Sequence, residues 1–245
     1  MLSLIEALTR LLNHLFAVPI TATMLKLGIH PVHPAAPINQ ALALESFIAF
    51  LMLLFFVLVR SVLSVERPGS AQHLVEIVHE FVCSQGEAII GHGYEPHVAI
   101  ATIVLVFLLC CNFTGLLPGI DSVTSDPVVP LGVALVVFLY YHWNGVRAQG
   151  PIGYLKHFAG PVWWIAPLLF PIEIISHFAR IMSLTIRLYA NMFASDLLTL
   201  VFFSMIPIGI PIIFLGLHFA VSVIQAYVFM LLTLIYLSQA VAHEH

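Results

Sequence analysis

Long apolar runs, most of them near the length of a membrane-spanning helix, dominate the pattern of hydrophobic and polar positions. Apolar residues fill the ranges 42–59, 97–117, 128–142 and 212–240 almost continuously. About 20 such residues in a helix cross the ~30 Å hydrocarbon core of a bilayer. A fifth run, 171–207, contains no glycine and no internal proline. The pattern predicts an all-α, polytopic membrane protein with five transmembrane crossings.

Two further segments have a helical period but are more polar. Residues 70–91 carry too many charges to cross a membrane, so we expect one amphipathic helix on the membrane surface. Residues 1–28 include an amphipathic stretch that we expect to end at Pro19, before a proline-rich linker at 28–37.

These segments predict a single membrane domain over residues 1–245. It has an N-terminal tail (1–37), peripheral helices (38–170) and a long, tilted two-helix hairpin at the C-terminal end (171–245).

Basic residues lie in two of the connections between spans: Arg60, Arg67, Arg147 and Lys156. We expect Lys156 to lie in a loop after the third span. The connections at 119–127 and 207–211 contain no lysine or arginine. The positive-inside rule then predicts an external N-terminus and a cytoplasmic C-terminus.

Composition excludes several classes of protein. The chain is 61% hydrophobic and 8% charged, whereas soluble domains carry about 25% charged residues. No basic cluster indicates nucleic-acid binding, and no glycine-rich loop indicates a nucleotide site or an ATP-hydrolysing enzyme. The three cysteines lack metal-ligand spacing, and we expect no cofactor. The spacing of His73, Glu76 and His79 places them on one helical face. Such a face could bind a metal, but it is more commonly a solvated surface.

The run 171–207 carries its polar residues on one stripe. A helix of this length would span about 52 Å, so it must tilt strongly or project beyond the hydrocarbon. At 100° per residue the following side chains fall within about a third of its circumference: Glu173, Ser176, His177, Arg180, Ser183, Arg187 and Asn191.

Arg187 is the most costly of these residues, because apolar helix continues on both sides of it. A guanidinium at the bilayer centre costs between about 2.5 and 17 kcal/mol, and arginine does not lose its proton in proteins. We therefore expect a partner carboxylate or a water-filled cavity beside Arg187. The alternative is that its side chain extends to the membrane interface as an anchor.

The last run has a matching stripe, made of His218, Ser222, Gln225, Thr233 and Tyr236. If the two helices pair in antiparallel fashion about residue 208, two residues that are equally far from 208 in the sequence lie at the same height in the hairpin. Arg180 then lies level with Tyr236, and Asn191 with Gln225. Asp196 lies within about one turn of His218.

The hairpin therefore orders its polar groups by depth. Asp196 and His218 lie toward the outside, Arg187, Asn191 and Gln225 are central, and Glu173, His177, Arg180 and Tyr236 lie toward the cytoplasm. Asp196 is about 180° from Arg187 around the helix. Two laterally displaced clusters, separated by a buried cation, favour two half-channels over one pore. The alternative is that the groups only satisfy one another between packed helices.

At these residues the chain resembles subunit a of the F-type ATP synthase membrane sector. The segments that carry the resemblance are SLTIRLYANMFASDLL (183–198), IQAYVFMLLTLIYLS (224–238) and CNFTGLLPG (111–119). They occur in the family's order, and the resemblance covers the chain from about residue 38 to the end.

The resemblance implies roles for single residues. Arg187 matches the family's essential arginine, and Asn191 and Gln225 match its neighbours. Asp196 and His218 match the outer half-channel pair in its bacterial arrangement, and Glu173 matches an acid of the inner one. Two positions depart from the family pattern: Ser195 stands where glycine is usual, and Ile181-Met182 replaces a proline-containing pair.

The resemblance also implies a function. The family conducts protons to and from carboxylates on a ring of c subunits, beside a peripheral stalk of subunit b, in the bacterial inner membrane. The chief alternative is a secondary proton-coupled transporter, which would show internal repeats and broken helices. The sequence shows neither feature, nor the clustered His and Glu ligands of an intramembrane metalloprotease.

Overall fold

The computed structural model describes residues 2–26, 36–61, 63–64, 69–117, 122–159, 166–205 and 209–241. Within these ranges the chain is helical and contains no strand. The elements are α1 (Leu2–Lys26), α2 (Gln40–Ser61), α3 (Ser70–Ile90), α4 (Glu95–Phe113), the short 3-10 helices η1 (Thr114–Leu116) and η2 (Val123–Ser125), α5 (Val128–Ala159), α6 (Ala166–Met205) and α7 (Ile210–Val241). The all-α prediction is confirmed.

The described residues contain five helical segments long and apolar enough to cross a membrane. They are Gln40–Ser61, Glu95–Leu116, Val128–Gly150, Pro167–Met205 and Ile212–Val241. These segments match the five predicted crossings, so the chain is a multi-pass membrane protein. Helix α3 is not among them, and its bounds lie within one residue of the predicted 70–91. Its position on the membrane surface stays a prediction.

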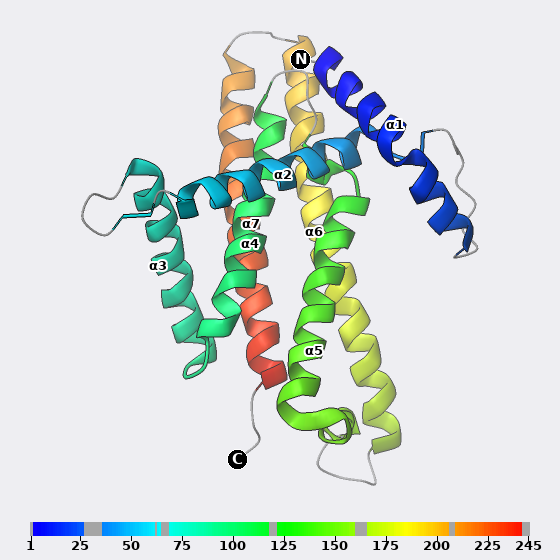
Figure 1. The fold of residues 1–245 in the computed structure, drawn as a ribbon, viewed down its shortest axis with the longest axis vertical. Coiled ribbons are helices and arrows are strands. Elements are labelled where there is room, and N and C mark those ends of the chain that lie inside the picture. Colours follow the sequence, from blue (N-terminus) through cyan, green and yellow to red (C-terminus); the bar gives the residue numbers. More distant parts are fainter. Residues whose placement is uncertain are drawn as a thin grey trace.

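Helices α4, α5, α6 and α7 lie side by side as the main bundle (Figure 1). Helix α5 packs against α6, α4 packs against α7, and α7 also contacts both α5 and α6. All four helices contribute to one apolar core, which includes Leu108, Val137, Leu188, Met192 and Leu237. Polar side chains that enter this bundle are therefore held between rigid helices.

Helix α2 runs across the direction of the main bundle (Figure 1). Its 22 residues span about 33 Å, close to the ~30 Å of a bilayer core. Helix α6 has 40 residues and spans about 60 Å. Both helices fit one bilayer if α2 stands upright and the bundle tilts strongly, which agrees with the tilt inferred from the sequence.

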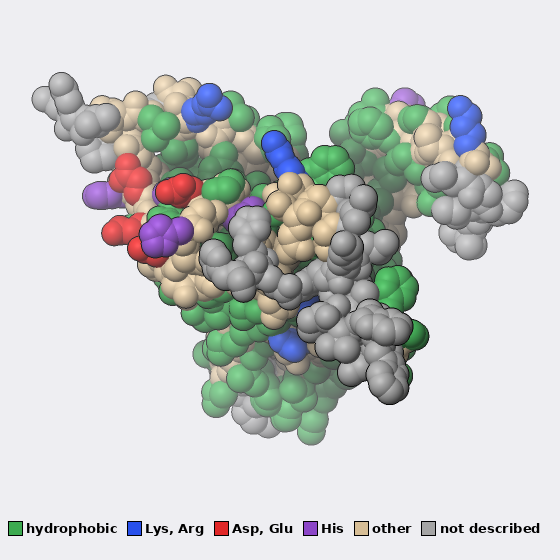
Figure 2. Space-filling view, turned by 90° about the horizontal axis from the view of Figure 1, so that it is seen from below, with side chains coloured by type: hydrophobic (Ala, Val, Ile, Leu, Met, Phe, Trp, Pro, Cys, Tyr) green, Lys and Arg blue, Asp and Glu red, His purple; other side chains and the backbone are tan. Residues whose placement is uncertain are grey.

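The outside of the molecule is largely apolar, as lipid contact requires. Large hydrophobic side chains such as Phe50, Leu53 and Val57 of α2 are exposed. Seen along the bundle, hydrophobic side chains cover much of the surface, and acidic and histidine side chains gather at one margin (Figure 2). Helix α3 packs on α4 and α7 through a small apolar cluster that includes Val82, Ala101 and Met230.

The predicted end of the first helix at Pro19 is wrong. Helix α1 continues through Pro19 to Lys26. A proline removes one backbone hydrogen bond inside a helix. The helix continues on both sides of the proline, and the hydroxyls of Thr21 and Thr23 donate to the carbonyls of Ala17 and Pro19 at 2.7 and 3.0 Å.

The predicted loop around Lys156 is also wrong, because α5 resumes after a bend and includes that residue. Gly150 adopts φ 74° and ψ 160°, a conformation that glycine reaches without steric cost. The following proline suits the first turn of a new helix. Helix α6 likewise begins at Ala166, before Pro171, where a missing N–H interrupts only the first turns. Most of the linker 28–37 and part of the turn 207–211 lie outside the described residues.

Candidate functional site

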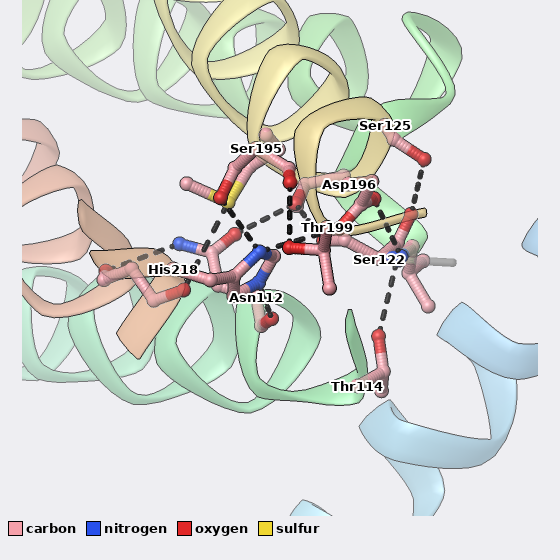
Figure 3. A network of polar contacts seen from close by, with 12 residues as sticks. Asn112, Thr114, Ser122, Ser125, Ser195, Asp196, Thr199 and His218 are labelled. Carbon is pink, nitrogen blue, oxygen red and sulfur yellow. Dashed lines mark hydrogen bonds and ion pairs between the residues drawn. The ribbon is translucent and has the colours of Figure 1, made fainter. Parts of the chain in front are cut away.

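The first polar group is the Asp196 cluster, defined by Asp196, His218, Ser195, Asn112, Ser122 and Thr124 (Figure 3). Asp196 Oδ1 lies 3.3 Å from His218 Nδ1, which confirms the height predicted from antiparallel pairing. The backbone N–H of Ser122, just before η2, donates to Asp196 Oδ2 at 2.9 Å. The carboxylate is thus fixed through both oxygens.

Helix α4 and the segment around η2 complete this cluster. His218 Nε2 lies 3.2 Å from the backbone oxygen of Asn112. The Asn112 side chain donates to the carbonyl of Ser222 at 3.2 Å and accepts from the Thr124 hydroxyl at 2.7 Å. His218, Asn112 and Thr124 are fully buried, so this is a closed polar network.

Gly115 makes the close approach of η1 to the acid–histidine pair possible. A Cβ atom at this position would lie 2.8 Å from Asp196 Oδ1 and 2.8 Å from His218 Cε1. Such contacts are shorter than van der Waals packing allows. Any larger residue at position 115 must therefore displace the pair.

The second polar group is the His177 cluster, defined by Glu173, His177, Tyr141, Arg180 and Tyr236. His177 Nε2 lies 3.4 Å from Glu173 Oε1, and His177 Nδ1 lies 2.8 Å from the hydroxyl of Tyr141 on α5. The Arg180 guanidinium lies over the Tyr236 ring at 5.1 Å from its centroid, at the height predicted from the hairpin.

A small cavity opens among these residues. It has a volume of about 40 Å³ and is lined by Tyr141, Tyr154, Glu173, His177, Arg180, Tyr236, Gln239 and Ala240. One water needs about 10–15 Å³ measured in this way, so a few water molecules fit. The cavity therefore has room for water beside the His177 cluster.

Arg187 lies between the two clusters in sequence but on a different face of α6. Its side chain is exposed, together with Asn191 one turn on. Its Nη2 atom lies 3.5 Å from the Ser183 hydroxyl. Among the described residues no aspartate or glutamate forms an ion pair with Arg187, whereas Asp196 and Glu173 each pair with a histidine. The guanidinium is therefore exposed on the surface of this chain, and the expected partner carboxylate or water-filled cavity beside Arg187 stays a prediction.

Gln225 on α7 links this helix to α6 at Arg187. Its side chain is buried, and its Nε2 atom donates to the backbone oxygen of Arg187 at 3.0 Å. This bond ties α7 to α6 at the height of the arginine without neutralising the guanidinium. The arginine is positioned by its backbone, and its charge stays available on the open face.

The stripe on α6 is thus divided between two surfaces. His177 faces the interior, whereas Ser183, Arg187 and Asn191 face outward. The stripe on α7 behaves as predicted, since His218, Ser222, Gln225 and Thr233 are all buried.

Several residues of both clusters escaped sequence reasoning. Asn112 lies inside the segment 111–119, and a polar side chain within an apolar span could have indicated it. Tyr141 offered the same signal on the third span. Ser122 and Thr124 gave none, because loop hydroxyls are common.

The fold and the site define a polytopic helical membrane protein with two acid–histidine clusters and an exposed arginine that no described carboxylate pairs with. The family model for the ATP synthase A chain matches residues 43–238. The chain is 53% identical to ATP synthase subunit a of Koribacter versatilis over 237 residues, 97% of either chain. It is 43% identical to ATP synthase subunit a of Solibacter usitatus over 219 residues, 89% of this chain and 94% of that one. A third relative, ATP synthase subunit a of Helicobacter hepaticus, is 39% identical over 181 residues, 73% of this chain and 80% of that one.

This chain belongs to the ATP synthase subunit a family. It therefore has a role in the membrane sector of ATP synthase, in a complex with other subunits of that assembly, and in proton transport linked to ATP synthesis.

Proposed function

We propose that this chain conducts protons through two half-channels, to and from carboxylates on a ring of c subunits. Proton flow would thereby be coupled to rotation of the ring and to ATP synthesis elsewhere in the complex. In this proposal the chain itself catalyses no reaction. The Asp196 cluster belongs to the outer half-channel and the His177 cluster to the inner one.

The exposed guanidinium of Arg187 is the observation that carries the proposal. Arginine remains charged inside a membrane, and an unpaired charge there is costly. Among the described residues no carboxylate pairs with Arg187, which supports a counter-charge supplied by a neighbouring subunit. A carboxylate on a neighbouring subunit meets this need. Ala190 and Ala194 are also exposed on α6, and their small side chains let another helix approach closely.

The separation of the two clusters supports half-channels over a single pore. Asp196 and His218 bond to α4 and to the segment around η2, whereas His177 bonds to α5. The two clusters thus bond to different parts of the bundle. In this proposal a moving carrier, the rotating ring, takes the proton from one cluster to the other.

The side chains suit the steps that this mechanism needs. His218 Nδ1 lies 3.3 Å from Asp196 Oδ1, so the two side chains are close enough to relay a proton from outside to the ring carboxylate. Opposite Arg187 the fixed cation favours the ionised carboxylate, which then releases its proton toward the His177 cluster. The same cation repels protons that would pass directly between the clusters.

The remaining expectations belong to the same proposal. The chain would lie in a bacterial inner membrane with its C-terminus in the cytoplasm. A peripheral stalk of subunit b would hold it still while the ring turns. The translocated ion would be the proton, and no nucleic acid or cofactor would take part.

The proposal is tested by replacing Arg187 with alanine in the complete complex. In vesicles energised by a proton gradient, Arg187→Ala should abolish ATP synthesis while the complex still assembles, as judged by native gel electrophoresis. Arg60→Ala removes an exposed arginine at the end of α2 and should synthesise ATP normally. Normal synthesis by Arg187→Ala would defeat the proposal.

A second experiment tests the identity of the partner. A photo-reactive amino acid at exposed Ala190 should cross-link to the ring subunit, and the same group at buried Ala226 should not. Cross-links from Ala190 to lipid alone would contradict a ring on this face.

A further inference from the structure

The hydrogen bonds of His218 show which ring nitrogen exchanges the proton. Nε2 lies 3.2 Å from the backbone oxygen of Asn112. A carbonyl oxygen only accepts hydrogen bonds, so Nε2 carries a hydrogen whether the ring is neutral or charged. Nδ1 is therefore the atom that gains and loses a proton.

Nδ1 has two neighbours on α6, the Ser195 hydroxyl at 2.9 Å and Asp196 Oδ1 at 3.3 Å. When the ring is charged, Nδ1–H donates to the carboxylate. When the ring is neutral and Asp196 is ionised, two lone pairs face each other, because an ionised carboxylate cannot donate. The Ser195 hydroxyl is then the side-chain donor that the structure places within reach of Nδ1.

The surroundings leave no simple substitute for this hydroxyl. His218 is fully buried and Ser195 is 8% exposed. Serines in helices commonly bond to the carbonyl one turn back. The bond that the structure gives the Ser195 hydroxyl instead reaches the histidine on α7. Asp196 is the charged side chain that faces the ring among the described residues, since α4 and η1 present Asn112 and Gly115 there.

We propose that Ser195 is a positioning residue that stabilises the proton-free state of the His218–Asp196 pair and so lets the pair release its proton. The proposal rests on the proton-conducting function proposed above. A buried acceptor without a donor is destabilised. When His218 Nδ1 carries no proton, the Ser195 hydroxyl donates to it and so stabilises the proton-free pair. Glycine, which is usual in the family at this position, offers no such donor.

Ser195→Ala keeps the helix propensity and removes the donor, so it is the direct test. The pair then holds its proton to higher pH. Proton conduction by the membrane sector in vesicles should show its half-maximal pH raised by about 0.5 to 1 unit, which corresponds to one lost hydrogen bond of ~1 kcal/mol. If Ser195→Ala assembles poorly, Ser195→Gly tests the same loss.

Matched variants separate this role from a loss of packing. Thr199→Val removes a hydroxyl one turn further along α6, which donates to the backbone oxygen of Ser195 at 2.9 Å and not to the histidine, and its pH profile should match the parent. Ser195→Thr retains a hydroxyl and should restore the parental profile. A Ser195→Ala profile that superimposes on the parent, or a Ser195→Thr profile that follows Ser195→Ala, would overturn the inference.

His218→Ala, measured in the same series, separates the inference about Ser195 from the proposed relay through His218 and Asp196. If His218→Ala changes conduction and Ser195→Ala does not, the Ser195 inference fails and the proposed relay stands. If His218→Ala also conducts with the parental pH profile, the relay itself is wrong.

Discussion

The two acid–histidine pairs have the same chemistry in different surroundings. In the Asp196 cluster the histidine side chain is 1% exposed and the acid 12% exposed, and both are fixed by backbone groups. In the His177 cluster the corresponding values are 11% and 38%. Aromatic rings and a cavity of about 40 Å³ surround the second pair. The first pair is more enclosed by protein groups, and the second is more exposed and lies beside a cavity large enough for water.

The two environments predict different costs for the same substitution. In an enclosed network each lost hydrogen bond leaves a buried group unsatisfied, whereas water can replace a lost partner at a more exposed site. We therefore expect larger effects at the Asp196 cluster than at equivalent positions of the His177 cluster.

The largest effect within the two clusters is expected from Gly115→Val. The new side chain overlaps Asp196 Oδ1 and His218 Cε1, because even a Cβ atom would lie 2.8 Å from each. Proton-driven ATP synthesis should fall to background. Gly132→Val on α5 is the control, since a Cβ at position 132 meets no atom within 4 Å. Equal activity of the two variants would contradict the geometry at Gly115.

A smaller effect is expected from His218→Ala, which should slow proton uptake about tenfold, equivalent to ~1.4 kcal/mol, without abolishing coupling. Asp196 remains fixed by the Ser122 N–H, and water can enter the vacated space. Proton uptake is measured across pH 6–8, where a histidine titrates. A rate that equals the parental rate at every pH would remove His218 from the relay.

The equivalent change in the other cluster, His177→Ala, should slow proton release only about two- to threefold, since water can bridge Glu173 and Tyr141 in the existing cavity. Release is followed in the same vesicles with a dye on the opposite side. If His177→Ala proved more damaging than His218→Ala, the contrast between an enclosed and a more exposed site would be wrong.

The smallest effect is expected from Tyr236→Phe. The ring under Arg180 is retained, and its centroid lies 5.1 Å from the guanidinium carbon. The cation–π contact is therefore kept, so ATP synthesis should stay within about twofold of the parent. Tyr236→Leu removes the ring and should lower synthesis further. Similar losses in both variants would mean that the hydroxyl, not the ring, is the group that matters.

Sequence reasoning predicted the hairpin well because helix geometry is regular. A fixed rise per residue sets the height of every side chain once the turn is located. For this reason the contacts of Asp196 with His218 and of Arg180 with Tyr236 followed from their positions alone. Hydrophobic length likewise predicted the five spanning segments.

What could not be predicted depends on packing between distant segments. Asn112 and Tyr141 reach the clusters because α4 packs on α7 and α5 on α6, and no spacing in the sequence encodes those pairings. The outward face of Arg187 was missed for a similar reason. A stripe a third of a helix wide can lie half inside a bundle and half outside it, and only the neighbouring helices decide which half is covered.

The central claim is that the Arg187 cation keeps two proton paths apart on the open face of α6. The most direct test measures ATP synthesis and passive proton leak in the same Arg187→Ala vesicles, with the assembled complex quantified in both assays. We expect synthesis to be lost while proton leak through the membrane sector rises above the parental level. Parental synthesis together with parental leak would contradict it.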